Sequence, residues 1–285
     1  SGESNDGHVT KVDANRLDEL TNEILGQSTE RLVKKYHLSL PEADSLGPAL
    51  MAYHAIASEL KLENIFVAPF SLRDGIIEEL ASGGKWPKTV DREIIRSAVQ
   101  LGRQYNFDYE HAIHVSRLAM TLFEQLSELH ELGSRFEIVL EMAAILHEIG
   151  VFVSNRSYHK HSMYLIRNSE FFGISRRDLE MVALVARYHR RATPQPNHDA
   201  FSKLNRGDRV SIAKMASILR IAKALDASRY QRIKEIKCEK KGNKVVIRIF
   251  GLADISLETL EMGKSGQMFS DLFGVNLSLE LGGER

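Results

Sequence analysis

The stretch Ser134-Arg-Phe-Glu-Ile-Val-Leu-Glu-Met-Ala-Ala-Ile-Leu-His-Glu-Ile-Gly150 decides the fold class of this chain. Its apolar residues recur at three- and four-residue steps, which predicts an amphipathic helix that ends at Gly150. His147 follows Ala143 by four residues and therefore shares the buried face of this helix. Because a polar ring is costly to bury without a partner, the stretch also indicates a polar site inside a helical domain.

Similar apolar stripes follow Asp108, run from Arg177 to Arg190 and run from Ser211 to Ala227, so we expect a mainly α-helical bundle. Each stripe carries an ionisable residue on its apolar face, namely His111, His189 and Asp226. Imidazole and carboxylate groups together suit a divalent transition metal. The bundle therefore predicts a metal site made of His111, His147, Glu148 and Asp226. The alternative is that each is a hydrogen-bonded core residue.

The two flanks of the bundle have a different pattern. Residues 65–68 form a short apolar run that predicts a strand, Ser71 could cap a following helix, and Gly83–Gly84 marks a domain boundary. Gly47–Pro48 is expected to interrupt the helix that starts near Pro41. After the bundle, alternating residues around a Gly242–Asn243 turn predict a hairpin in a small α+β module.

The charge distribution predicts a polyanionic ligand. The chain has 38 basic and 38 acidic residues, yet residues 155–245 hold 21 Lys and Arg against 8 Asp and Glu. Such a block concentrates phosphate groups, although it could also coat solvated helices. The candidate phosphate contacts stand in two short motifs and are Lys160, His161, Arg187, His189, Arg190 and Arg191.

Composition indicates the cellular location and the kinds of partner to expect. Cys238 is the single cysteine, so no intrachain disulfide can form, and we expect a cytoplasmic protein. No apolar run reaches the ~18 residues of a membrane helix, so no membrane partner is expected. Nucleic acid is a weaker expectation than a small polyanion, because no groove-reading motif is present.

Five motifs resemble one family. Ser71-Leu-Arg-Asp-Gly, Ala144-Ile-Leu-His-Glu-Ile-Gly, His159-Lys-His-Ser-Met-Tyr-Leu-Ile, Ala186-Arg-Tyr-His-Arg and Leu219-Arg-Ile-Ala-Lys-Ala-Leu-Asp are similar, in this order, to the Ppx/GppA phosphatases. That family comprises exopolyphosphatases and guanosine pentaphosphate phosphohydrolases. The resemblance implies that residues 8–83 are the end of a second actin/Hsp70-like α/β lobe, residues 88–230 an HD-like helical bundle, and residues 233–282 a small β-containing C-terminal module.

The resemblance also implies that catalysis and ligand binding belong to different parts of the full-length protein. The family's catalytic carboxylates and its Mg²⁺ belong to lobes whose glycine-rich phosphate loops are missing from this sequence. The chain is therefore interpreted as the C-terminal half of a full-length phosphoanhydride hydrolase. In this interpretation the half binds polyphosphate or guanosine pentaphosphate, lacks the main catalytic residues, and a homodimer is open to it.

Two alternatives stay open. Where metal-dependent HD enzymes have a His-Asp pair, this chain has His147-Glu148, and Glu is one methylene longer. If a divalent metal nevertheless binds there, the chain would be a self-sufficient HD-type phosphohydrolase acting on a nucleotide or phosphodiester. A chain that binds its ligand without turnover would instead be a sensing or dimerisation module.

Overall fold

The computed structural model describes residues 10–68, 77, 88–190, 192–195 and 197–283. Residues 88 and 89 are described by their backbone alone. The chain divides into two compact units, residues 1–84 and 85–285. The boundary expected at Gly83–Gly84 falls on residues outside the described ranges. The motif at residues 71–75 and the helix expected after Ser71 lie outside the described residues.

In residues 10–68, the first unit combines a two-stranded antiparallel sheet with three helices. Strands β1 (Thr10–Asp13) and β2 (Asn64–Val67) pair, and between them run α1 (Ala14–Leu25), α2 (Thr29–Tyr36) and α3 (Leu40–Glu59). A reciprocal capping box between Ser39 and Glu42 starts α3. The helix continues through Pro48, so the expected interruption at Gly47–Pro48 is wrong. Its N-terminal turns are stabilised by the capping box and by packing of Ala43 and Leu46 in the small core of this unit.

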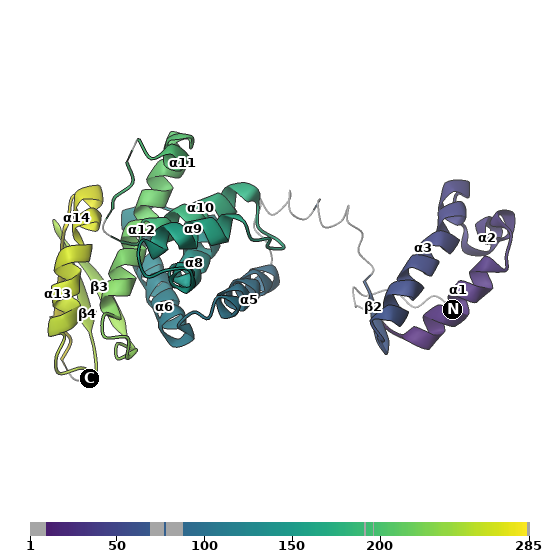
Figure 1. The fold of residues 1–285 in the computed structure, drawn as a ribbon, viewed down its shortest axis with the longest axis horizontal. Helices are drawn as coiled ribbons and strands as arrows, with labels where there is room; N and C mark the ends of the chain where they lie inside the picture. The colour runs from purple at the N-terminus through teal and green to yellow at the C-terminus, as the bar shows by residue number, and fades with distance from the viewer. Residues whose placement is uncertain (1–9, 69–76, 78–87, 191, 196, 284–285) are drawn as a thin grey trace. The chain divides into compact units, whose positions relative to one another are not determined.

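The second unit is mainly helical (Figure 1). Its long helices are α5 (Lys88–Gln104), α6 (Tyr109–Gln125), α8 (Arg135–Leu146), α9 (Tyr158–Arg167), α10 (Arg176–Arg187) and α12 (Arg206–Leu225). Shorter turns are α7 (Ser127–His130), the 3₁₀ helix η1 (Ile149–Phe152) and α11 (Asp199–Ser202). Helix α8 ends earlier than the expected Gly150, and the chain turns at His147 and Glu148 into η1.

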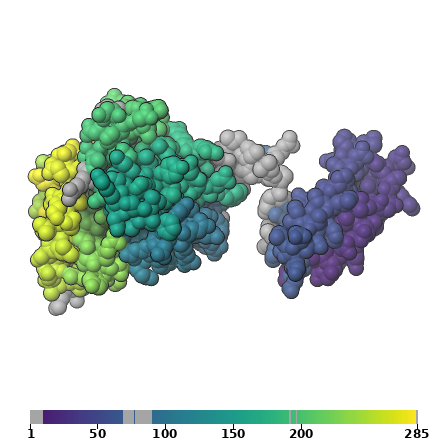
Figure 2. Space-filling model, in the orientation of Figure 1, coloured from purple at the N-terminus to yellow at the C-terminus, as the bar shows by residue number. Residues whose placement is uncertain are grey.

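A three-stranded sheet closes the second unit. Strands β3 (Ile236–Lys241) and β4 (Lys244–Ile249) form the expected hairpin, and β5 (Asn276–Leu281) pairs parallel to β4 after a crossover through α13 (Ser256–Ser265) and α14 (Gln267–Phe273). Helices α13 and α14 pack on α12, and Val245, Ile247 and Phe269 belong to the same hydrophobic core as the bundle. The space-filling view shows the C-terminal segment lying directly against the bundle surface (Figure 2).

None of the helices in the described part of the chain combines the length and apolar character that crossing a membrane requires.

Candidate functional site: a histidine cluster beside a basic face

Three helix ends of the second unit bring together the four residues expected as metal ligands. His111 lies in the first turn of α6, where Asp108 caps the helix by accepting from the His111 amide. His147 and Glu148 follow α8, and Asp226 follows α12. Because polar groups at helix ends need not compete with intrahelical hydrogen bonds, these ends can form a polar site within an apolar core.

Gly150 and Ser162 hold α9 close to the end of α8. The Ser162 hydroxyl donates to the His147 carbonyl oxygen at 2.9 Å and accepts from the Gly150 amide at 2.9 Å. A Cβ atom at Gly150 would collide with the Tyr158 carbonyl oxygen, so only glycine permits this approach. The contact places Tyr158, at the start of α9, next to Glu148.

Three buried imidazoles form what we call the histidine cluster: His111, His147 and His189. The His147 and His189 ring centroids lie 4.9 Å apart, and those of His111 and His147 lie 5.6 Å apart. Each ring uses Nδ1 for a structural hydrogen bond: His147 to the Ala144 carbonyl oxygen at 2.7 Å, His189 to the Ala186 carbonyl oxygen, and His111 to Asp226 Oδ2 at 2.7 Å.

This bonding pattern fixes the tautomers. A carbonyl or carboxylate oxygen accepts the Nδ1 proton, so in each neutral ring Nε2 carries a lone pair. The Nε2 atoms of His111 and His147 are buried and have no hydrogen-bond partner. Burial lowers the pKa of His147 to about 4 and holds the pKa of His189 well below its usual value, so both rings are neutral at pH 7. Such lone pairs suit a hydrogen-bond donor or a metal ion and do not suit an anion.

Glu148 is the acidic member of the site. Its Oε2 lies 3.9 Å from His111 Nε2, and its Oε1 lies 3.8 Å from His147 Nε2. Among the described residues, these three form the one group of His, Cys, Asp or Glu side chains close enough to share a metal ion, with ligand atoms all within 4.8 Å of one another.

Glu148 is also held by cations. Arg229 Nη2 lies 2.5 Å from Oε2, Lys223 Nζ lies 3.7 Å from Oε1, and the Tyr158 hydroxyl donates to Oε1 at 3.0 Å. Burial acts to raise the pKa of Glu148, but the neighbouring positive groups lower it further than burial raises it, and the net shift is downward. The carboxylate therefore stays ionised at neutral pH.

Asp226 stands behind His111 and outside the three-residue group. Its Oδ2 accepts from His111, and its Oδ1 accepts from the Gln231 amide at 2.9 Å. A carboxylate bonded to the far nitrogen of a histidine orients the ring and makes Nε2 more basic. The four residues expected as ligands thus lie in one place, three of them in the group and the fourth as a support of His111.

The cations of α9 and α10 lie beside this cluster. Lys160, His161, Arg187 and Arg190 form what we call the basic face. The Arg190 guanidinium lies 4.6 Å from the Tyr158 ring centroid, and Arg187 lies 5.6 Å from that of Tyr188. Burial is the largest cause that lowers the pKa of His159 to about 4, and the positive charges of all four residues act in the same direction, so all four lie near this ring.

One expected phosphate contact, His189, does not lie on this face. His189 is buried in the histidine cluster, with its Nε2 3.3 Å from the Tyr158 hydroxyl, and Arg191 lies outside the described residues. The structure adds residues that the sequence analysis did not single out, namely Tyr158 and Arg229. Tyr158 touches both Glu148 and Arg190 and so links the histidine cluster to the basic face.

Arg220 fixes the segment that carries Arg190. It is 5 % exposed and donates to the carbonyl oxygens of Tyr188 and Ala192, at 2.7 and 2.6 Å. These bonds cap the C-terminal end of α10, so Arg220 supports the basic face from inside and does not belong to it.

Comparison with known proteins identifies the family of this chain. A family model described as Ppx/GppA phosphatase, domain III, matches residues 94–261. A guanosine-5'-triphosphate,3'-diphosphate pyrophosphatase of Photobacterium profundum is 26 % identical over 183 residues, which are 64 % of this chain and 36 % of the relative. One of the same name from Pseudoalteromonas translucida is 29 % identical over 141 residues, 48 % of this chain and 27 % of the relative. The chain thus spans between about a quarter and just over a third of these relatives' lengths, and it belongs to the Ppx/GppA phosphatase family.

Proposed function

We propose that this chain is the C-terminal region of a phosphoanhydride hydrolase that releases phosphate from polyphosphate or guanosine pentaphosphate, and that this region binds the polyanion. The catalytic carboxylates and their Mg²⁺ would belong to actin-like lobes outside this chain. Family membership and the names of the two relatives support the reaction class.

The observation that carries the binding role is the set of cations left without anionic partners. Among the described residues, Lys160, Arg187 and Arg190 form no ion pair with a carboxylate. Other arginines of the same helices are paired, Arg167 with Glu180 and Arg177 with Asp208. Unneutralised charge that depresses the pKa of a neighbouring histidine favours an anionic ligand, and a chain of phosphates would neutralise several cations together.

An exposed apolar surface supports the assignment of residues 8–83 to a larger lobe. Tyr53 and Ile56 of α3 are exposed, as is Leu60 directly after this helix, and Phe66 and Val67 of β2 are exposed as well. A two-stranded sheet is marginally stable by itself, because it needs further strands or helices to bury its apolar side. We infer that further chain of the same protein covers this surface.

The test is binding of fluorescently labelled polyphosphate at increasing salt concentration. We expect Arg190→Gln and Arg187→Gln each to weaken binding and to lower the slope of log K against log salt, because each removes one phosphate contact. Arg96→Gln is a matched control, since Arg96 is exposed on α5 and pairs with Glu93. Equal losses in all three variants, or binding that salt does not affect, would contradict the proposal.

A metal-dependent HD-type phosphohydrolase is the second candidate, and the unpartnered Nε2 atoms of His111 and His147 favour it. With Glu148 they supply two imidazoles and a carboxylate, which fit Zn²⁺, Mn²⁺ or Fe²⁺. A bound divalent cation would supply Lewis acidity toward a phosphoryl oxygen. Arg229 and Lys223 compete for the same carboxylate, so Glu148 would have to exchange its present partners.

Elemental analysis beside hydrolysis assays separates the candidates. If the cluster binds metal, Arg229→Gln should raise the metal content because it frees Glu148, and His147→Gln should abolish it. Stoichiometric metal together with turnover by this chain alone would replace the first proposal with the second. Tight binding of guanosine pentaphosphate with neither metal nor turnover in any assembly would favour a sensing module.

A further inference from the structure

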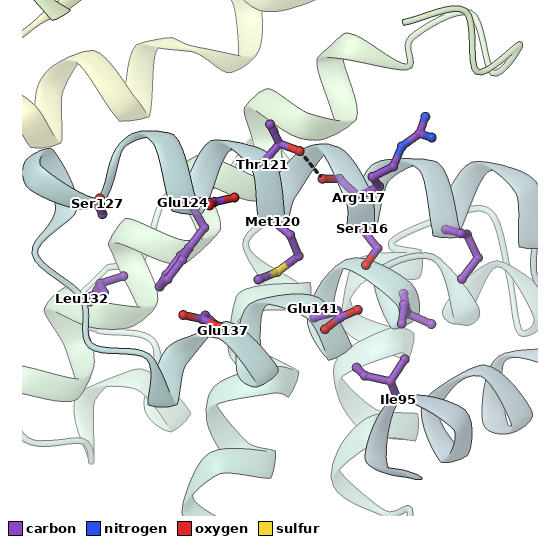
Figure 3. Close-up of a pocket in the computed structure, with 13 residues that line it drawn as sticks. Ile95, Ser116, Arg117, Met120, Thr121, Glu124, Ser127, Leu132, Glu137 and Glu141 are labelled. Carbon is purple, nitrogen blue, oxygen red and sulfur yellow. Dashed lines mark hydrogen bonds between the residues drawn. The ribbon is translucent and has the colours of Figure 1, made fainter. Parts of the chain in front are cut away.

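A groove of about 640 Å³ opens on the second unit between α6 and α8, with α5 at one end. Its floor is apolar and includes Ile95, Met120 and Ile145. Figure 3 shows Ser116 and Met120 of α6 facing α8, which carries Glu137 and Glu141. The volume lies within the range of small-molecule sites in proteins.

The rim of the groove is acidic. Glu124, Glu137 and Glu141 line it, and none of them is ion-paired within the described part of the chain. Burial raises the pKa of Glu141, and the negative charges of Asp91 and Glu137 raise it further. Arg117 is the one cationic residue among those lining the groove, and its Nη2 lies 2.8 Å from His114 Nδ1.

A hydroxyl also faces the groove. The Ser116 residue is 4 % exposed, it lines the groove, and its hydroxyl is not one of the buried polar atoms without a partner among the described residues, so the oxygen is open to the groove. It can therefore donate a hydrogen bond to a ligand in the groove or accept one from it.

The separation between the carboxylates indicates which shape of cation would fit the groove. No three of the acidic side chains lining the groove lie close enough to share a metal ion, because the one such group among the described residues is His111, His147 and Glu148. A compact dication would therefore contact fewer carboxylates than an extended one. Methylene groups would cover the apolar floor, while separated ammonium groups would reach the acidic rim.

We propose that this groove binds an aliphatic polyamine, with ammonium groups at Glu137, Glu141 and Glu124 and methylene segments over Met120 and Ile145. This site is separate from the histidine cluster and the basic face, so it does not depend on the proposed function.

Isothermal titration with spermidine at low salt tests the site. The double variant Glu137→Gln/Glu141→Gln should weaken binding about tenfold or more, since two charge pairs are lost and one of them is partly buried. It should fold normally, because the substitution removes a like-charge contact at i and i+4. Putrescine, with one ammonium group fewer, should bind more weakly than spermidine.

The matched control is Glu128→Gln/Glu131→Gln, which removes the same charge from nearby exposed positions outside the groove. Spermidine affinity unchanged in the control and lost in the groove variant is the expected result. Equal losses in both variants would overturn the proposal, because binding would then report net charge. Displacement of spermidine by an equal concentration of Mg²⁺ would also overturn it, since a compact dication would then suffice.

Discussion

The histidine cluster and the basic face are close neighbours, yet they handle charge in opposite ways. Beside the histidine cluster, the Glu148 side chain is 11 % exposed, forms ion pairs with Arg229 and Lys223, and accepts a hydrogen bond from Tyr158. On the basic face, Arg187 and Arg190 rest on tyrosine rings and have no carboxylate in contact within the described part of the chain. Buried charge is paired because the interior penalises it, whereas Arg187 and Arg190 are only partly buried and remain solvated without a carboxylate. The difference predicts that substitutions in the two regions affect different properties.

The largest expected effect is on stability, from Glu148→Ala. The variant leaves Arg229, Lys223 and the Tyr158 hydroxyl without their acceptor and should cost about 3 kcal/mol of unfolding free energy. Chemical denaturation measures it, with Glu137→Ala as an exposed control expected within about 0.5 kcal/mol of the parent.

The pH dependence provides a second check on Glu148. Its pKa is lowered in the folded chain, so its stabilising contribution is complete above the unfolded value of ~4.3 and is lost as the pH falls through the folded pKa. The difference in stability between the parent and Glu148→Ala should therefore shrink in acid. A difference that stays constant down to strongly acidic pH would mean that packing, and not charge, explains the loss.

Arg220→Ala is expected to have the next largest effect on stability, and it should also affect ligand binding, so it tests whether the two regions are independent. Arg220 is buried, but the carbonyl groups that it binds belong to the segment carrying Arg190. Two carbonyls without donors should cost about 2 kcal/mol, and polyphosphate binding should weaken although no exposed cation is removed. Arg220→Lys should recover part of both losses, because it keeps the charge and one hydrogen bond. Full binding by a destabilised Arg220→Ala would show that the segment keeps its place without this support.

The double variant Arg187→Gln/Arg190→Gln should weaken polyphosphate binding without lowering stability. Both guanidinium groups lie outside ion pairs with described carboxylates, so unfolding free energy should change by less than about 0.5 kcal/mol while the salt dependence of polyphosphate binding falls. Denaturation curves and salt titrations of the same preparation measure both quantities. A loss of stability comparable with that of Glu148→Ala would remove the distinction between the regions.

The sequence alone predicted the parts of the fold that depend on periodicity. The stripes around Val139 and Leu219 gave buried helices, and Gly242–Asn243 gave the observed hairpin. It was wrong at Pro48, because tertiary packing and a capping box keep α3 continuous where local propensity favours a break. Which histidine bonds to which oxygen depends on how helix ends meet, and spacing along one helix does not contain that information.

The candidate site shows the same limit. Spacing placed His111, His147, His189 and Asp226 on apolar faces, and the structure brings the three histidines together with Asp226 bonded to His111. Spacing could not show that Asp226 bonds to Nδ1 of His111. It also could not show that His189 is buried while Arg190, one residue later, lies on the basic face, since neighbouring residues at a helix end point in different directions. Arg229 was missed because it follows α12 in a turn at φ 57°, where no helical pattern applies.

The smallest expected effect, and the most specific to the basic face, is on the titration of His159. Burial, together with the charges of Arg190, Arg187, Lys160 and His161, which repel the added proton, lowers the pKa of its imidazole to about 4. The unfolded chain therefore binds this proton more readily, and stability should fall slightly as the pH drops from ~6.5 toward 4. Bound polyphosphate would neutralise the cations, so it should raise the pKa of His159.

NMR titration of the His159 ring with and without polyphosphate measures that shift directly. Arg190→Gln should raise the pKa in the free chain and reduce the further rise on binding, because one of the repelling charges is already gone. His130 is the control: it is buried, and burial is the main cause of its lowered pKa, so polyphosphate should leave its titration unchanged. If His159 does not respond while polyphosphate binds, the ligand lies elsewhere, and the unpaired cations beside the histidine cluster require another explanation.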